Sequence, residues 1–222
     1  MCVLYDINIV MDYSAYLISN KPHFFESIKE NIKPIELKYF DGTGYSSFSK
    51  LVNSCVETAP TEVVIMMSDK VLPTAENVSK LLNLIDQGYG LVGLYRFAFF
   101  GFKKELFRTV GPLDERFVGG GFEDDDYYIR LREANIAMYV TEEIAYEKRS
   151  SSWNYELSRP HFIKKWIPDF NPNIKINQNK IKRSLPEETY NYNFGKKIPT
   201  SFLDWSKTEA SSHKSRKFTK GM

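Results

Sequence analysis

The sequence predicts a single α/β domain in which helices cover both faces of a mostly parallel central sheet. Three observations indicate this three-layer architecture. Strand-like apolar runs alternate with helical stripes through the first half of the chain. Residues 62–67, EVVIMM, are almost continuously apolar, which is typical of a strand buried on both faces. An acid, Asp69, follows this run, at the end of a strand where open α/β sheets bind ligands.

The composition excludes several classes of protein. The 222 residues are 42% hydrophobic and 26% charged, which indicates a folded, water-soluble chain. A formal net charge of +2 lacks the positive excess of a dedicated nucleic-acid binder, so we expect no nucleic-acid partner. Two cysteines, Cys2 and Cys55, are too few for a disulfide framework, and a reducing cytoplasm fits them best.

No membrane or secretion signal is evident in the sequence. The N-terminal residues carry Asp6 and Asp12 and lack a basic start followed by an apolar run. The longest apolar stretch, residues 91–102, is interrupted by Arg96 and is shorter than the ~20 residues that a membrane-spanning helix needs. We therefore expect no transmembrane segment.

The first elements follow a strand, helix, strand order. Residues 3–11 are rich in β-branched side chains and predict the first strand. Residues 24–31 have helical spacing and stop before Pro34. Residues 35–40 predict the second strand, which ends in the turn at residues 41–44, DGTG.

The middle of the chain has the clearest periodicity. Residues 48–58 place apolar side chains at i, i+3, i+4, i+7 and i+8 and predict an amphipathic helix that Pro60 closes. The buried strand at 62–67 follows. Residues 74–87 predict the next helix, which ends at Gly88.

The later elements are shorter. Residues 90–102 are strand-rich, and residues 103–110 predict a short helix ended by Gly111-Pro112. Residues 124–134 predict a helix that opens on a block of acids, which suits a helix N-terminus. Residues 139–141 and 144–146 predict late strands.

The pattern weakens after Trp153, which suggests a division of the chain into three parts. We expect a catalytic domain over residues 1–170, an irregular extension over 171–204 that packs on it, and a flexible tail over 205–222. The tail is rich in lysine and arginine. Its simplest interpretation is a solvated tail, and a peripheral contact with a membrane surface is the alternative.

The segment at residues 119–126, GGGFEDDD, has the composition of a site. Four carboxylates among adjacent residues repel one another, and three glycines lose much backbone entropy when they are ordered. An acceptor hydroxyl is a poor nucleophile, and a carboxylate within hydrogen-bond reach can remove its proton. A solvated acidic helix start, stabilised by the helix dipole, is the competing interpretation.

The segments 100–107, 110–117 and 121–131 together resemble the acceptor half of family 2-like glycosyltransferases with the GT-A fold. Residues 119–126 are also similar to the Gly-Gly-Glu-Asp-Asp segment of the β-1,4-galactosyltransferases. The resemblance implies a GT-A type α/β/α sandwich. It also implies an enzyme that moves a hexose or deoxyhexose from a nucleotide-sugar, UDP-linked sugars favoured, to a hydroxyl of a glycan acceptor.

The resemblance also implies roles for individual residues that bind the acceptor or the nucleobase of the donor. The family's catalytic base falls on Asp124, with Glu123 and Asp125 as neighbours that bind acceptor hydroxyls. The acid that binds the donor's base falls on Asp41, whose competing interpretation is an ordinary turn aspartate. Tyr13, which follows the first predicted strand, is assigned to the donor as well.

On the diphosphate side, Ser68-Asp69-Lys70 stands where the family carries an Asp-x-Asp that holds Mn²⁺ or Mg²⁺. Asp69 is its single acid here, so either the diphosphate completes the coordination or Lys70 supplies part of the countercharge. His161 is a second candidate ligand, with a structural histidine as its alternative. Arg96 is expected to reach an acid of the site, because an unpaired arginine in an apolar stretch is costly.

Two further expectations concern the region near His161. Arg159, Lys164 and Lys165 are candidate phosphate-binding cations. Trp153, Tyr155 and Trp166 are either an aromatic floor for a sugar or parts of the core, and core is the commoner use of such side chains.

Two other functions remain as alternatives. A nucleotidyltransferase would need a glycine-rich basic loop after the first strand, which residues 11–14 do not supply. A sugar- or calcium-binding protein without glycosyl transfer would use the acidic run, but Asp124 to Asp126 lack the alternating spacing of a calcium loop.

Overall fold

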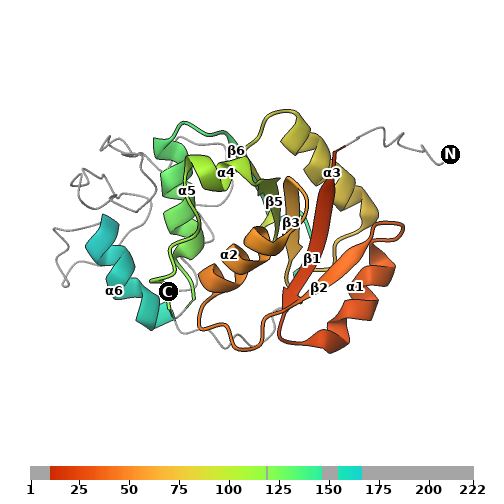
Figure 1. The fold of residues 1–222 in the computed structure, drawn as a ribbon, viewed down its shortest axis with the longest axis horizontal. Coiled ribbons are helices and arrows are strands. Elements are labelled where there is room, and N and C mark those ends of the chain that lie inside the picture. The colour runs from red at the N-terminus through yellow and green to blue at the C-terminus, as the bar shows by residue number, and fades with distance from the viewer. Residues whose placement is uncertain (1–10, 119, 147–154, 167–222) are drawn as a thin grey trace.

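A six-stranded sheet forms the centre of the protein (Figure 1). The computed structural model describes residues 11–118, 120–146 and 155–166. The strand order is β2-β1-β3-β5-β4-β6, and the strands are β1 Tyr13–Ser19, β2 Leu37–Asp41, β3 Val63–Met67, β4 Leu91–Phe97, β5 Phe99–Lys103 and β6 Met138–Val140. β1 is parallel to β2 and β3, and β4 is parallel to β6, whereas β5 is antiparallel to both β3 and β4. The sheet is therefore mostly parallel, as predicted.

Helices cover both faces of this sheet. They are the 3-10 helix η1 Pro22–Phe24, α1 Phe25–Asn31, α2 Phe48–Thr58, α3 Ala75–Asp86, α4 Glu105–Thr109, α5 Glu123–Glu133 and α6 Tyr155–Trp166. Side chains of α1 and α3 pack in one core cluster, and side chains of α2, α4 and α5 pack in the other. Figure 1 shows the first pair beside β1 and β2 and the second group on the opposite side. These are the three layers that the sequence predicts.

The strands alternate their side chains between the two cores, as the period of two requires. In β3, Val64 and Met66 belong to the cluster under α2, whereas Val63, Ile65 and Met67 belong to the cluster under α3. Every residue of β3 is buried. The continuously apolar run thus becomes a central strand with no solvent-facing side.

Local signals set the helix ends. α2 has the predicted bounds, and the Ser47 hydroxyl accepts a hydrogen bond from the Lys50 amide. At α3, Thr74 and Asn77 form a reciprocal capping box. The expected stripe of α3, Val78, Leu81, Leu82 and Ile85, is buried.

Three expectations about elements need correction. β1 was not predicted: residues 13–19 were interpreted as following a strand at 3–11, and residues 3–10 lie outside the described part. Residues 144–146 form no strand, and Tyr146 makes one isolated bridge with Val71. Helix α6 was also not predicted, because Pro160 interrupts its sequence and its apolar residues form no stripe.

Two further sequence expectations concern the rest of the chain. Among the described residues, no helix is both long and apolar enough to cross a bilayer. The predicted extension at 171–204 and tail at 205–222 lie outside the described residues, so the division into three parts stays a prediction.

Candidate active site

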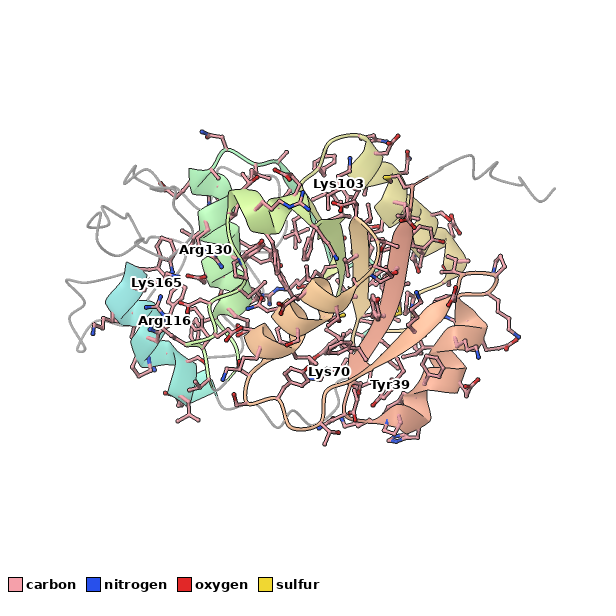
Figure 2. The ribbon with its side chains drawn as sticks, in the orientation of Figure 1. Tyr39, Lys70, Lys103, Arg116, Arg130 and Lys165 are labelled. Atoms are coloured by element: carbon pink, nitrogen blue, oxygen red, sulfur yellow. The ribbon has the colours of Figure 1, made fainter. Side chains whose placement is uncertain are left out.

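The carboxyl ends of four strands meet at one edge of the sheet. Ser19 at the end of β1 pairs with Asp41 at the end of β2, and Leu17 pairs with Met67 at the end of β3. β4 runs in the same direction as β3, because each is antiparallel to β5. Figure 2 shows Tyr39 and Lys70 at this edge and Lys103 at the other. We call the first one the carboxyl edge.

Asp69 lies at the carboxyl edge with a lysine on each side. Its Oδ2 is 3.1 Å from Nζ of Lys21, which follows β1, and its side chain is 10% exposed. Lys70 is half-buried, and its amide donates to the Ser68 hydroxyl. Burial lowers the pKa of Lys70, the charge of Asp69 opposes this and the charge of Lys21 adds to it, so the pKa lies below its ordinary value. One carboxylate therefore interacts with two ammonium groups.

Asp41 and Tyr39 occupy the β2 side of the same edge. Asp41 is exposed, and hydrogen bonds from Thr43 hold the pKa of its carboxyl below the ordinary value. The Tyr39 hydroxyl donates to the Ser19 carbonyl at 2.6 Å. Burial raises the pKa of Tyr39, and the charges of Asp41 and Asp69 raise it further. Asp41 and Asp69 thus act on one side chain, as neighbours at this edge.

Tyr13 does not join these residues. It is the first residue of β1 and pairs with Val63, the first residue of β3, so it lies at the opposite edge of the sheet. At about 3.3 Å per residue, that is roughly 20 Å from the end of β1. The sequence placed Tyr13 wrongly relative to Asp41 and Asp69, because the strand begins at this residue instead of ending before it.

Arg96 connects the end of β4 with the start of α5. Its NH2 lies 2.7 Å from Oδ2 of Asp124 and 3.8 Å from Oδ1 of Asp125. Arg96 has a φ of 49°, and its amide donates to the Thr141 carbonyl. Burial alone would lower the pKa of this guanidinium, but the carboxylates, Asp124 first, raise it above its ordinary value. The expectation that Arg96 reaches an acid is confirmed.

Glu123 differs from its neighbour Asp124. The Glu123 side chain is buried, and its Oε2 has no hydrogen-bond partner among the described residues. Burial and then the charge of Asp124 raise the pKa of Glu123 to about 8. Asp124 is 16% exposed and paired with Arg96. Glu123 therefore favours its protonated form near neutral pH, next to the Arg96–Asp124 ion pair.

The backbone before α5 explains the glycines of the acidic segment. Gly120, Gly121 and Phe122 have φ values of 71°, 81° and 69°, in the left-handed region that glycine tolerates best. Phe122 tolerates this conformation while its ring packs 5.0 Å from that of Phe162 on α6. This path turns the chain so that Glu123 and Asp124 begin the helix.

Asp126, the last of the four acids, belongs to a buried ionic network instead of the edge. It is 0% exposed, and its Oδ2 accepts from Arg130 at 3.0 Å. Its Oδ1 accepts from the Trp166 indole at 2.8 Å and also contacts the Lys165 ammonium. Lys165 and Trp166 are therefore structural in this arrangement, and Trp166 is part of the core.

His161 joins the same network through a different acid. Its Nε2 is 2.8 Å from Oδ2 of Asp114, which also accepts from Lys165 at 3.2 Å. Its ring packs edge-on against Phe117 at 4.7 Å. These contacts favour the structural interpretation of His161, and its role as a metal ligand stays a prediction.

The Asp69 side and the Asp124 side of the carboxyl edge are adjacent. The Ser68 amide donates to the Ala98 carbonyl in the turn between β4 and β5. Tyr146 stacks on Tyr95 with centroids 4.7 Å apart. Burial raises the pKa of Tyr146, the charge of Asp69 raises it further, and the charge of Arg96 lowers it. The Tyr146 hydroxyl therefore interacts with charges from both sides of the edge. The structure thus brings Asp41, Asp69, Lys70, Arg96 and the acids Glu123 to Asp125 to one edge.

The sequence analysis missed Lys21, Tyr95 and Tyr146. Lys21 follows a strand that was not predicted, so its place at the carboxyl edge had no signal. Tyr95 directly precedes Arg96 in a strand-rich stretch, and its partner is 51 residues away in a segment predicted to be a strand. Only the fold shows that the two rings stack on each other and that Tyr146 lies close enough to Asp69 to interact with its charge.

The donor atoms at the carboxyl edge offer limited support for a protein-held divalent ion. Asp69 supplies hard carboxylate oxygens of the kind that Mn²⁺ and Mg²⁺ accept. The described residues contain no group of three or more histidine, cysteine or acidic side chains placed to hold a metal. An ion at Asp69 would therefore take most of its ligands from a bound diphosphate and from water.

Comparison with known proteins identifies the fold. No family model matches the sequence, and neither does any curated protein. A mannosyltransferase from Pyrobaculum calidifontis, solved with GDP-Man and Mn²⁺, superposes with a TM-score of 0.53 at 11% identity. The match covers 67% of this chain and 60% of that chain, so this chain spans about three fifths of that structure. The fold is of the GT-A type, as the resemblance implied.

Two structures of Drosophila β1,4-galactosyltransferase 7 are more distant. The catalytic domain in complex with xylobiose has a TM-score of 0.45 at 15% identity, covering 76% of this chain and 78% of that one. A mutant in complex with manganese, UDP-Gal and xylobiose has a TM-score of 0.44 at 14% identity, covering 75% and 78%. These similarities are too low to transfer residue roles, which must come from the carboxyl edge itself.

Proposed function

We propose that this chain is a glycosyltransferase that moves a hexose or deoxyhexose from a nucleotide-sugar to a hydroxyl of a glycan acceptor. The observation that carries the proposal is the carboxyl edge of a GT-A fold. There, Asp69 and two lysines lie next to the Arg96–Asp124 pair. Cations can receive the diphosphate of a donor, and a paired carboxylate can receive the proton of an acceptor.

Asp124 is the base in this proposal. The contact with Arg96 holds its carboxyl group in position, and its partial exposure lets an acceptor hydroxyl approach. The hydroxyl proton moves to the Asp124 carboxylate while the hydroxyl oxygen forms a bond to the anomeric carbon. The bond from that carbon to the diphosphate oxygen breaks, and the leaving nucleoside diphosphate keeps the electron pair. This direct displacement inverts the anomeric configuration.

The donor would lie along the β1–β3 side of the edge. Asp41 would accept hydrogen bonds from the base, and we favour uracil as that base. Lys70 and Lys21 would face the diphosphate. Mn²⁺ or Mg²⁺, held by Asp69 and diphosphate oxygens, would neutralise charge on the leaving group. Asp125 and the protonated form of Glu123 would bind acceptor hydroxyls.

The test compares wild type with Asp124→Asn, which keeps the shape of the side chain and removes the base. We expect transfer and donor hydrolysis to fall by about 10² to 10⁴-fold, whereas the rise in Tm caused by bound UDP should remain. Asp86→Asn, at an exposed position on the last residue of α3, is the matched control.

The assay uses UDP-, GDP- and dTDP-sugars, each with Mn²⁺ and with EDTA. Binding of a nucleotide-sugar without transfer or hydrolysis under any condition would replace the proposal with a sugar-nucleotide binding protein. Equal activity in Asp124→Asn and wild type would remove Asp124 from its role.

A further inference from the structure

The strongest unexplained feature of the carboxyl edge is its balance of charge around Asp69. In a site built for a divalent ion, we would expect several oxygens to face the cation. Here Asp69 Oδ2 is instead occupied by the ammonium group of Lys21 at 3.1 Å. A second ammonium group, that of Lys70, is close enough for Asp69 and Lys21 to shift its pKa. The Asp69 carboxylate therefore has two ammonium groups near it.

Hydrogen bonds from the backbone amides of Lys21 and Lys70 fix the position of each residue. The Lys21 amide donates to the Ser19 hydroxyl at 3.0 Å, directly after β1. The Lys70 amide donates to the Ser68 hydroxyl, and the Ser68 amide is in turn bonded to Ala98. Both lysines therefore have backbones that are fixed just after adjacent parallel strands, which reduces the entropy lost when their ammonium groups bind an anion.

The Lys70 ammonium group differs from that of Lys21 in its ion pairing. Among the described residues it makes no salt bridge of its own, because the Asp69 carboxylate is paired with Lys21. It is nevertheless half-buried. Burying a cation without an ion-pair partner raises the free energy of the folded protein, and a bound anion would offset this penalty.

We propose that Lys21 and Lys70 bind the diphosphate of the nucleotide directly, so that nucleoside diphosphates bind this protein in the absence of a divalent ion. Asp69 orients Lys21 toward the phosphates. This inference rests on the proposed function, since it concerns the donor side of the same site. Lysine ammonium groups bind phosphate as point charges, and the affinity must fall as the salt concentration rises.

The experiment is calorimetric titration with UDP, GDP, UMP and uridine in EDTA, and again in Mn²⁺. We expect wild type to bind UDP in EDTA, with affinity falling from UDP to UMP to uridine. Lys70→Met should weaken UDP binding by about tenfold or more, as expected for the loss of a charged hydrogen bond, and should leave uridine binding unchanged. Lys21→Met should behave similarly.

Lys103→Met is the matched control, since it removes the same charge from the opposite edge of the sheet (Figure 2). Lys21→Met leaves Asp69 without its partner, so the double variant Lys21→Met/Asp69→Asn separates loss of the cation from the effect of a bare carboxylate. A Tm measurement on each variant shows whether it is folded.

The outcomes separate this inference from the proposed function. UDP binding that requires Mn²⁺ and is equal in wild type and Lys70→Met overturns the lysine assignment and leaves the glycosyltransferase proposal intact. Equal weakening by Lys103→Met overturns it too, because net charge alone then explains the effect. Failure of UDP and GDP to bind in either buffer overturns both proposals.

Discussion

Glu123 and Asp124 are neighbours in sequence but lie in different electrostatic surroundings. Asp124 pairs with Arg96 and is partly exposed, whereas Glu123 is buried next to the Asp124 charge. A carboxyl whose pKa is shifted by burial and by a neighbouring charge is typical of sites that transfer protons. At this scale, the arrangement favours a protonated Glu123 beside the Arg96–Asp124 ion pair.

The raised pKa of Glu123 predicts how stability depends on pH. The pKa is about 8 in the folded protein against an ordinary 4.5. Between these values the folded state binds more protons than the unfolded state, so the free energy of unfolding falls as pH rises from about 4.5 to about 8. Glu123→Gln cannot ionise, and at pH 8 its Tm should exceed that of wild type by roughly 2 to 4 °C or more.

Thermal unfolding of both proteins from pH 5 to pH 9 measures this difference, which should widen as pH rises. Glu26→Gln, at an exposed position on α1, serves as the control. Parallel Tm profiles for Glu123→Gln and wild type would show that Glu123 titrates normally.

Single residues also show what a sequence can and cannot predict about a site. Asp69 was predictable because a continuous apolar strand leads directly to it. The need of Arg96 for an acid was predictable from its apolar neighbours, but its partner, 28 residues away, required the fold. Lys21 carries no pattern at all, since a lysine after a strand is ordinary until the neighbouring strand brings Asp69 beside it.

The start of α5 depends on three successive left-handed residues. An alanine at Gly121, where φ is 81°, would cost about 1 to 2 kcal/mol because Cβ crowds the following carbonyl. We expect Gly121→Ala to lower Tm by roughly 2 to 8 °C and to reduce activity by misplacing Asp124. Thermal unfolding and the transfer assay measure both effects. Glu57→Ala in α2 is the control. An unchanged Tm in Gly121→Ala would mean that a side chain at position 121 does not strain the backbone.

α6 is attached to α5 largely through the charges around Asp126. Lys165 and Trp166 from α6 contact this carboxylate, as does Arg130 from α5. Asp126→Ala would leave buried cations without their partner, which typically costs about 3 to 5 kcal/mol. Urea unfolding should therefore show a loss of this size, against little change in Asp86→Ala. A loss below about 1 kcal/mol would show that packing alone holds α6.

The elements differ in how far local sequence determines them. α2 and α3 carry both an apolar stripe and a capping residue, so their positions were predictable. β1 lacks polar alternation because it is buried on both faces, and a nearby apolar run at residues 3–11 competed with it. α6 lacks an apolar stripe and is attached through ion pairs of Lys165 instead. The sequence alone does not show these ion pairs, because their partners Asp114 and Asp126 are distant along the chain.

At the scale of the whole molecule, Asp41, Asp69, Lys70, Arg96 and the acids Glu123 to Asp125 lie at or next to the carboxyl edge. Ligand binding should therefore slow backbone hydrogen exchange asymmetrically. With saturating UDP, we expect protection in peptides that cover residues 19–21, 41–44 and 68–71, and no change in those that cover residues 59–62 and 103–105. Exchange measured by mass spectrometry tests this, and protection confined to the opposite edge would contradict the location of the site.

The turn between β4 and β5 limits how this protein can be redesigned. Ala98 alone separates the two strands, its amide bonds to Tyr95, and its carbonyl receives the Ser68 amide. An insertion there would release the segment that carries Asp69, so this hairpin tip is a poor place for grafted loops.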